Sequence, residues 1–327
     1  MLHILLLVAI FVVGLVILYY GAEGTLHGAV SIATRMGVSQ LVIGLTLVAF
    51  GTSAPELSLD ISAALKGSTQ LAFGDLIGSN ISNIGLILGV AAVIRPLHIN
   101  LRLLRAELPI MIAVSLLVFA LALDGEIGQL DGVIMIVAFV LFLGYSYRSA
   151  RKESAQVIEE FAAEAEGATV KGEPVGKSLL LVVGGLIGLV IGAQLMVYSA
   201  VEAASLLGVS ELLIGLTIVA IGTSLPELAT STVAARRGDA DIVVGNVVGS
   251  NIVNMLLVLA VVAMICPVPV APQSLRVDLP IMIAFAVAIV PLILRGMTIS
   301  RRDGYLLLAG MAAFLGWQIY AGLQAAG

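Results

Sequence analysis

The sequence has little charge, little cysteine and little histidine, and each shortage excludes a class of protein. Charged residues make up 11% of the 327 residues, apolar residues make up 60%, and the mean hydropathy is +1.13. This balance excludes an ordinary soluble domain and places the chain in a lipid bilayer. The single cysteine, Cys266, excludes an intrachain disulfide. The net charge of −5 gives no sign of a nucleic-acid partner, and none is expected.

Enzyme chemistry is not expected either. The three histidines, His3, His27 and His98, fall near predicted membrane edges. The sequence contains no His-Glu-x-x-His motif and no evident nucleophile–base pair. We therefore expect a protein that is not an enzyme and that has no resident cofactor.

Apolar segments long enough to cross a membrane recur along the whole chain. They lie near residues 4–34, 40–65, 71–94, 108–123, 128–147, 178–206, 211–235, 242–265, 279–295 and 304–320. We predict ten transmembrane helices from them. The first segment lacks the basic start of a signal peptide and is predicted to be a retained span.

Lysine and arginine residues indicate the orientation. With the N-terminus outside, 14 of the 16 basic residues fall in loops on the cytoplasmic side, and only Lys66 and Arg276 fall on the other side. The polar connection at residues 148–177 is then a cytoplasmic linker, and its composition predicts a short amphipathic helix on the membrane surface. We expect a multi-pass protein of the cell's inner membrane.

One long stretch occurs twice. Residues 41–90 recur as residues 212–261, at an offset of 171 without a gap, and 25 of the 50 positions are identical. Each half holds five predicted spans, an odd number, so the second copy must enter the membrane upside down. We therefore predict an all-α membrane protein with two inverted five-helix repeats, residues 1–147 and 178–327. Inverted repeats are typical of secondary transporters.

The motif Gly-Thr-Ser-x-Pro-Glu ends at Glu56 in one copy and at Glu227 in the other. A proline inside a helix deprives the carbonyl four residues earlier of its donor, and hydrocarbon offers that carbonyl no replacement. Each glutamate lies ten residues before a basic residue, Lys66 or Arg237, which places it about 15 Å from a membrane edge and near the midplane. No basic residue is available at that depth, so the carboxylates are expected to face each other across a cation or a polar cavity.

The helix after each motif carries a polar stripe. Its members are spaced four residues apart and share one helix face: Asp75, Ser79 and Asn83 in the first copy, and Asn246, Ser250 and Asn254 in the second. We expect both stripes to line the site. The same helices contain Gly74-x-x-x-Gly78 and Gly245-x-x-x-Gly249, a spacing that favours close helix packing.

With these motifs, both copies resemble the α-repeats of the calcium:cation antiporter superfamily, in particular its prokaryotic sodium/calcium exchanger branch. The resemblance implies four helices around a midplane site that binds either Ca²⁺ or several Na⁺ ions. It implies that Glu56 and Glu227 are the central ligands. The other ligands that it implies are Thr52, Thr223, Ser53, Ser224, Ser79, Ser250, Asn83 and Asn254, with the backbone carbonyls of Ala49 and Ala220.

Three positions depart from the family pattern. Asn254 stands where potassium-dependent relatives carry Asp, which argues against K⁺ dependence. Asp75 replaces the usual Asn, and Asp60 aligns with Ser231. Either extra carboxylate could line an access path, raise the affinity for divalent ions, bind a proton, or serve as a hydrogen-bonded helix partner.

The expected function is the exchange of Na⁺ for Ca²⁺ by alternating access. One chain is expected to suffice for transport, and the oligomeric state stays open. The nearest rival is coupling to H⁺, because burial disfavours a charged carboxylate; against it, proton/calcium exchangers of the superfamily usually carry Gly-Asn-x-x-Glu at the motif. A channel would share the polar lining, but the inverted repeat favours an antiporter. The sequence also leaves open whether another divalent ion is the substrate.

Overall fold

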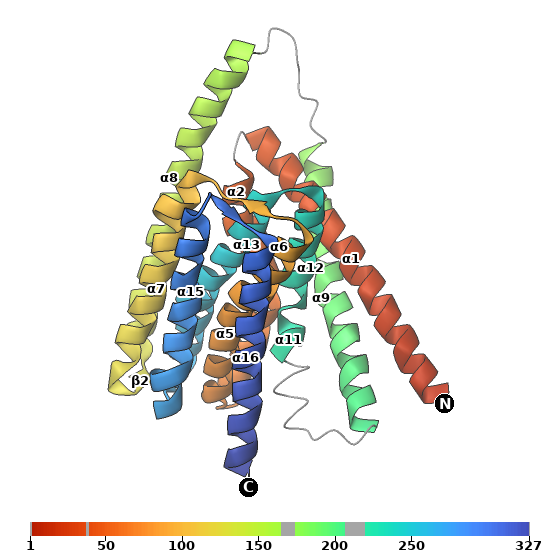
Figure 1. Cartoon of the computed structure of the whole chain (residues 1–327), viewed down its shortest axis with the longest axis vertical. Coiled ribbons are helices and arrows are strands. Elements are labelled where there is room, and N and C mark those ends of the chain that lie inside the picture. Colours follow the sequence, from red (N-terminus) through yellow and green to blue (C-terminus); the bar gives the residue numbers. More distant parts are fainter. Residues whose placement is uncertain (1, 37–38, 165–173, 207–219, 327) are drawn as a thin grey trace.

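The computed structural model describes residues 2–36, 39–164, 174–206 and 220–326 as a bundle of helices (Figure 1). Among the described residues, seven helices are long and apolar enough to cross a membrane, or eight if one pair bent by 42° counts as a single span. The all-helical membrane architecture is thus confirmed. Of the predicted spans, 211–235 begins outside the described residues, and 304–320 corresponds to the C-terminal helix and is not among these eight.

The order of the elements repeats in the two halves. The first half contains α1 (Leu2–Met36), α2 (Gln40–Ile43), the π-helical η1 (Gly44–Val48), α3 (Ala49–Thr52), α4 (Ala54–Leu65), α5 (Thr69–Ser82), the π-helical η2 (Asn83–Leu88), α6 (Gly89–Ile94), β1 (Leu97–His98), the π-helical η3 (Leu103–Glu107), α7 (Leu108–Leu121), the 3₁₀ turn η4 (Ala122–Asp124), β2 (Glu126–Ile127) and α8 (Gln129–Glu164). The second half contains α9 (Val175–Leu206), α11 (Ala220–Thr223), α12 (Leu225–Arg237), α13 (Ala240–Val253), the π-helical η6 (Asn254–Val258), α14 (Leu259–Ile265), β3 (Val268–Pro269), the π-helical η7 (Ser274–Asp278), α15 (Leu279–Leu294), β4 (Thr298–Ile299) and α16 (Arg301–Ala326).

The helix that carries the Gly-Thr-Ser-x-Pro-Glu motif breaks at the serine in both halves. Ser53 lies between α3 and α4 with φ −80° and ψ 4°, and Ser224 lies between α11 and α12 with φ −86° and ψ 5°. Pro55 and Pro226 then fall in the first turn of the next helix, where the missing proline N–H leaves no carbonyl of that helix without a donor. The sequence predicted a proline inside each helix, whereas the structure ends one helix at the serine and begins the next one just before the proline.

The helices α5 and α13 lie at the centre of the bundle, and α13 is buried at every position from Ile242 to Val253. Gly245 and Gly249 let α13 approach the first half closely, because a Cβ on them would lie 2.8 Å from the carbonyl oxygen of Leu41 and 2.6 Å from that of Leu45. The packing role predicted for this glycine pair is confirmed. The segment equivalent to residues 41–48, which would test the pair in α5, lies outside the described residues.

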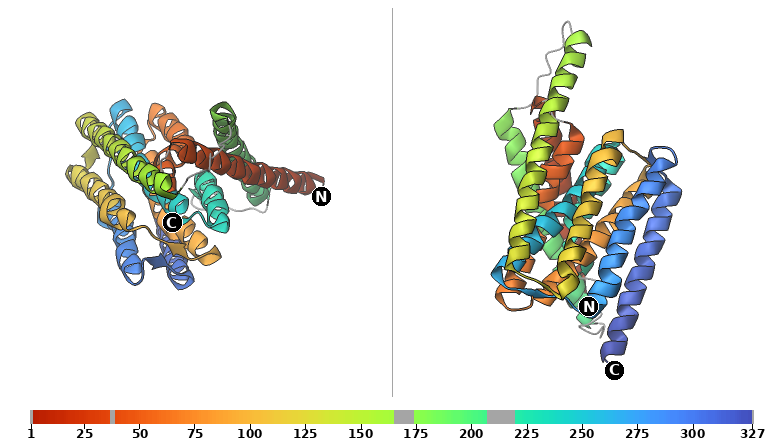
Figure 2. Two further views of the ribbon diagram at one scale, coloured as in Figure 1. Left: turned by 90° about the horizontal axis from the view of Figure 1, so that it is seen from above. Right: turned by 90° about the vertical axis from the view of Figure 1, so that its left-hand side faces the viewer.

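Two long helices, α1 and α9, pack along each other beside the central bundle (Figures 1 and 2). A Cβ on Gly21 would lie 2.8 Å from the carbonyl oxygen of Gly185, and one on Gly28 would lie 2.5 Å from that of Ser178. Residue numbers rise along one helix as they fall along the other, so the pair is antiparallel. Only residues without bulky side chains allow such a close approach.

Two short antiparallel strand pairs connect the halves at the helix ends. Leu97 and His98 of β1 pair with Ile299 and Thr298 of β4, and β2 pairs with β3 in the same way. These strands were not predicted, because two-residue segments carry too little alternation to be recognised in a sequence.

The connection between the halves differs from the prediction of a separate amphipathic helix. Helix α8 continues without a break from Gln129 to Glu164, and residues 165–173 lie outside the described residues. The segment after residue 147 is rich in Ala, Glu, Lys and Arg, which are strong helix formers, and the next glycine is Gly167. The transmembrane helix therefore extends beyond its apolar part.

Candidate functional site

The two motif glutamates lie in equivalent places at the start of a helix. Glu56 is in the first turn of α4 and Glu227 in the first turn of α12, where the positive end of the helix dipole favours a carboxylate. Their side chains are 0% and 1% exposed. Burial of both carboxylates was predicted, and the structure confirms it.

Hydrogen bonds between the halves bring the two motifs together. Ser53 Oγ donates to Glu227 Oε1 at 3.3 Å, and Thr52 Oγ1 lies 3.2 Å from Asn246 Oδ1. Both contacts join a residue of the first motif to a residue of the second repeat. The two copies therefore form one site.

Four asparagines hold α5 and α13 against each other. Asn80 Nδ2 donates to the Asn251 carbonyl at 3.2 Å, and Asn251 Nδ2 donates to the Asn80 carbonyl at 3.3 Å. Asn83 Nδ2 donates to Asn251 Oδ1 at 2.9 Å, and Asn254 Nδ2 donates to Asn80 Oδ1 at 3.3 Å. Because these bonds use the amide nitrogens of Asn83 and Asn254, their Oδ1 atoms remain available as acceptors.

Several buried oxygens of the predicted site have no hydrogen-bond partner. They are both carboxylate oxygens of Glu56, Oε2 of Glu227, Oδ1 of Asn83 and Asn254, and Oγ of Ser224 and Ser250. None of the ion pairs in the described part of the chain involves either glutamate. A buried set of oxygen acceptors with two negative charges is the environment that a hard cation such as Na⁺ or Ca²⁺ requires.

The remaining predicted ligands fall around this set. Thr52, Ser53 and Ser79 are buried, and Ser79 Oγ accepts from Asn254 Nδ2 at 3.3 Å. The Ala49 carbonyl already accepts two hydrogen bonds, from Ser53 N at 3.0 Å and from Thr52 Oγ1 at 3.3 Å. To act as the predicted ligand, the Ala49 carbonyl would have to bind the cation in addition to these hydrogen bonds or in place of one of them.

The equivalent residues of the second copy are less completely described. Thr223 is partly buried and lines a cavity next to the site. The backbone of Ala220 begins α11, but its surroundings lie outside the described residues. Within the residues that the structure describes, no three His, Cys, Asp or Glu side chains form a metal cluster. The candidate site therefore combines two carboxylates with hydroxyl and amide oxygens.

The two extra carboxylates do not join the contacts between the halves. Asp60 is 1% exposed, and neither of its oxygens has a hydrogen-bond partner. Asp75 is partly buried, and its Oδ2 also lacks a partner. Of the roles considered for Asp60, that of a hydrogen-bonded helix partner is wrong in this structure.

Two residues that position the site were not predicted, and the polar-stripe residue Asn246 makes a contact that was not predicted. Asn80 and Asn251 orient the predicted ligands Asn83 and Asn254, and Asn246 contacts Thr52 across the halves. The repeated Gly-Ser-Asn motif already contained Asn80 and Asn251, but they lie one position after the polar stripe. Their role depends on how α5 and α13 cross, which a single-helix face does not reveal.

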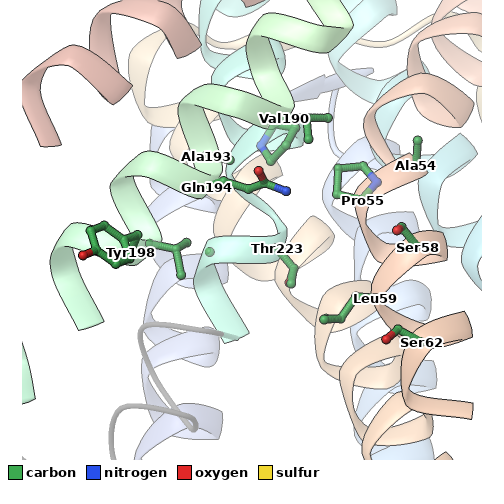
Figure 3. A pocket seen from close by; sticks show the side chains of 13 residues that line it. Ala54, Pro55, Ser58, Leu59, Ser62, Val190, Ala193, Gln194, Tyr198 and Thr223 are labelled. Carbon is green, nitrogen blue, oxygen red and sulfur yellow. The ribbon is translucent and has the colours of Figure 1, made fainter. Parts of the chain in front are cut away.

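A cavity of about 580 Å³ lies beside the site, between α4, α9 and the α11–α12 break (Figure 3). Its lining residues include Pro55, Ser58, Leu59, Ser62, Gln194, Tyr198, Thr223 and Pro226. The cavity reaches both motif prolines and is bounded by the C-terminal half of α9. The cavity therefore lies against the break in each motif.

The chain matches the family model of the sodium/calcium exchanger protein over residues 6–148 and 177–320. The putative antiporter CaxA of Alkalimonas amylolytica is 38% identical over 321 residues, covering 96% of this chain and 98% of the relative. The sodium/calcium exchanger MaX1 of Methanosarcina acetivorans is 33% identical over 338 residues, covering 94% and 96%.

A solved structure of the sodium-calcium exchanger NCX_Mj, soaked with 10 mM Na⁺ and 10 mM Sr²⁺, has the same fold, with a TM-score of 0.82 and 32% identity. The match covers 96% of this chain and 98% of the exchanger. The match of both halves, their shared site and these relatives lead to one conclusion: the chain belongs to the sodium/calcium exchanger protein family.

Proposed function

We propose that this protein is a secondary antiporter that exchanges Na⁺ for Ca²⁺ by alternating access. The observation that carries the proposal is the set of buried, unpartnered oxygens that both repeats contribute around Glu56 and Glu227. Two carboxylates offset the charge of one Ca²⁺ or of a small cluster of Na⁺ ions. An unloaded site would leave two charges near the membrane midplane, so movement without an ion is disfavoured and exchange is enforced.

The proposed architecture has ten spans in two inverted five-helix repeats. Three features support the inversion. Helices α1 and α9, related by the offset of 171, run antiparallel to each other. Asn80 and Asn251, related by the same offset, exchange equivalent hydrogen bonds. Strand β1 pairs with β4 while β2 pairs with β3, which is the exchange that a twofold relation requires.

In alternating access, each state of a transporter is open to one side of the membrane and closed to the other. The two sides of this bundle differ in this way. Arg237 at the end of α12 forms an ion pair with Glu23 of α1. The offset of 171 relates these residues to Lys66 and Gln194, and the cavity separates α4 from α9 on that side. We infer that the molecule is closed between α1 and α12 and open between α4 and α9.

The proposed orientation places the N-terminus and the open side outside the cell. It rests on the basic residues, most of which belong to the end of the bundle that contains Arg95, Lys177 and Arg237. A relative with 37% identity over 285 residues is named an inner membrane protein, YrbG of Escherichia coli, which supports the same membrane for this chain. A single chain supplies every proposed ligand, so a monomer suffices, and the transported ions are substrates rather than cofactors.

Coupling to Na⁺ rather than H⁺ is supported by the names of the relatives MaX1 and NCX_Mj, which are sodium/calcium exchangers. The geometry fits the same reading. The site offers hydroxyl and amide oxygens in addition to carboxylates, and hard cations such as Na⁺ prefer oxygen ligands.

The test is ⁴⁵Ca²⁺ uptake into proteoliposomes loaded with Na⁺, K⁺ or choline, or given a pH gradient. We expect uptake only with internal Na⁺, and we expect Glu56→Gln and Glu227→Gln to abolish it. Glu126→Gln is the matched control, because Glu126 is an exposed carboxylate at a helix connection. Uptake driven by the pH gradient without Na⁺ would move the assignment to proton coupling. Uptake that needs no counter-ion would exclude an antiporter.

A further inference from the structure

The first half holds two carboxylates that the proposed function does not use. Asp60 lies on α4 one turn after Glu56, and Asp75 lies on α5 one turn before Ser79. Asp60 is 1% exposed with both oxygens unpartnered, and Asp75 Oδ2 is buried and unpartnered. None of the ion pairs in the described ranges involves them. A carboxylate buried in this way needs a compensating partner.

In the second half, two neutral residues occupy the positions equivalent to Asp60 and Asp75, and they form a hydrogen bond. The offset of 171 relates Asp60 to Ser231 and Asp75 to Asn246. There, Asn246 Nδ2 donates to Ser231 Oγ at 3.1 Å, which joins α12 to α13. In the first half α4 packs on α5 in the same manner, and the carboxylates of Asp60 and Asp75 lie near enough to repel each other. Two ionised carboxylates supply only acceptors, so in that state no bond equivalent to that of Asn246 can form.

The pair does not line the open cavity. Helix α4 presents Pro55, Ser58 and Ser62 to the cavity, whereas Asp60 lies on another face of the helix. An enclosed pair of carboxylates is suited to hold an ion rather than to attract one from solvent. The position of Asp60 away from the cavity therefore favours an ion-binding site over the wall of an access path.

We propose that Asp60 and Asp75 form a second cation site, which takes a divalent cation between α4 and α5. One helical turn separates it from the central site, about 6 Å along the helix axis. A divalent ion offsets both carboxylates, whereas a monovalent ion leaves a net charge in an apolar surrounding. Carboxylate oxygens are the ligands that Ca²⁺ takes in proteins. The inference rests on the proposed function only in taking Ca²⁺ as the ion.

The test counts Ca²⁺ ions per chain by equilibrium ⁴⁵Ca²⁺ binding to the purified full chain in Na⁺-free detergent solution. We expect two ions for the wild type. The double variant Asp60→Ser with Asp75→Asn installs the neutral pair that the second half already carries, and we expect it to bind one. The complementary variant Glu56→Gln with Glu227→Gln removes the central carboxylates and should also keep one.

A wild-type count of one Ca²⁺ per chain at saturation overturns the second site, and so does a count of two in the Asp60→Ser, Asp75→Asn variant. Thermal unfolding shows whether that variant folds. If it does not, the Glu56→Gln, Glu227→Gln variant decides: one bound ion supports the second site, and none overturns it. Failure of Na⁺-driven uptake in proteoliposomes would contradict the proposed exchange without changing these counts, so the two proposals fail separately.

Discussion

At the scale of single residues, the amide groups of α5 and α13 decide which atoms face the site. Asn83 and Asn254 each use Nδ2 to bond an asparagine of the opposite helix, so their orientation follows from the hydrogen-bond network. Their Oδ1 atoms are then acceptors without a partner. The side chain of asparagine can both donate and accept hydrogen bonds. Here its nitrogen is occupied, so its oxygen can serve as a neutral ligand in the proposed site.

The positioning role of Asn80 is testable. The change Asn80→Ala removes the acceptor of Asn254 Nδ2 and the donor to the Asn251 carbonyl. We expect Ca²⁺ affinity to fall by about 10–100-fold, the usual effect of losing a group that orients a metal ligand. Calorimetric titration with Ca²⁺ measures the effect. Ser82→Ala is the control, since Ser82 is buried on the same helix but belongs to neither the site nor the network. Equal affinities in both variants would exclude this role.

At the scale of elements, the packing of α1 on α9 depends on missing side chains. A Cβ on Gly185 would lie 2.6 Å from the carbonyl oxygen of Gly21, which is backbone and cannot rotate away. The two helices therefore approach as closely as their backbones allow. The neighbouring Gly184 has no described atom within 4 Å of its Cβ position.

This difference predicts opposite outcomes for neighbouring glycines. We expect Gly185→Val to separate α1 from α9 and to lower stability by about 1–3 kcal/mol, the usual cost of overpacking. Gly184→Val is the matched control and should change stability little. Thermal unfolding of the purified variants in detergent compares them. A Gly185→Val protein as stable as the control would show that α1 and α9 are not in this contact.

A second pair of elements, α1 and α12, is held by the ion pair of Glu23 with Arg237. If this pair keeps one side closed, Arg237→Ala should shift the population toward the state in which the cavity beside α4 is shut. The readout is the rate at which an impermeant thiol reagent modifies Ser62→Cys, which lines that cavity. The background is Cys266→Ser, because Cys266 is the single native cysteine.

We expect slower modification of that cysteine in the Arg237→Ala protein than in its parent. Arg236→Ala is the control, because it removes the same charge from the preceding, exposed position. An equal slowing by both substitutions would assign the effect to surface charge and not to the contact between α1 and α12. A faster modification would contradict the proposed direction of the shift.

At the scale of the whole molecule, the two ends of the bundle are distinct. The first turns of α1 and the last turns of α16 lie at one end, and α8 extends beyond the other end (Figure 1). An even number of spans places both chain ends on one side, and an odd number in each half places the linker on the opposite side. In Figure 1 both chain ends lie opposite the extension of α8, as the proposed architecture requires.

Reporter fusions test this topology. We expect alkaline phosphatase to be inactive when fused after Glu164, in the cytoplasm, and active when fused after Ala326, outside the inner membrane. A green fluorescent protein fused at the same two positions should show the reverse, which controls for expression. Activity of the phosphatase after both positions would contradict an odd number of spans in the second half.

The sequence by itself determined the membrane setting, the repeat, the lost helix hydrogen bond at each motif proline and the identity of the buried glutamates. These features follow from local chemistry: apolar length, a ring without an N–H, and carboxylates at midplane depth without a basic partner. The offset of 171 also related every predicted ligand to its counterpart before any contact was known. For Glu56 and Glu227 the sequence needed no tertiary information.

Only the tertiary structure decided which hydrogen bonds form between the two halves. The orientation of Asn83 and Asn254, the roles of Asn80 and Asn251, and the pairing of Ser53 with Glu227 depend on the angle and register at which helices meet. Local sequence does not encode that register, because each helix face is compatible with several neighbours. The same holds for the difference between the halves: Asp60 and Asp75 were visible as departures, but their burial without partners emerged only once α4 had packed on α5.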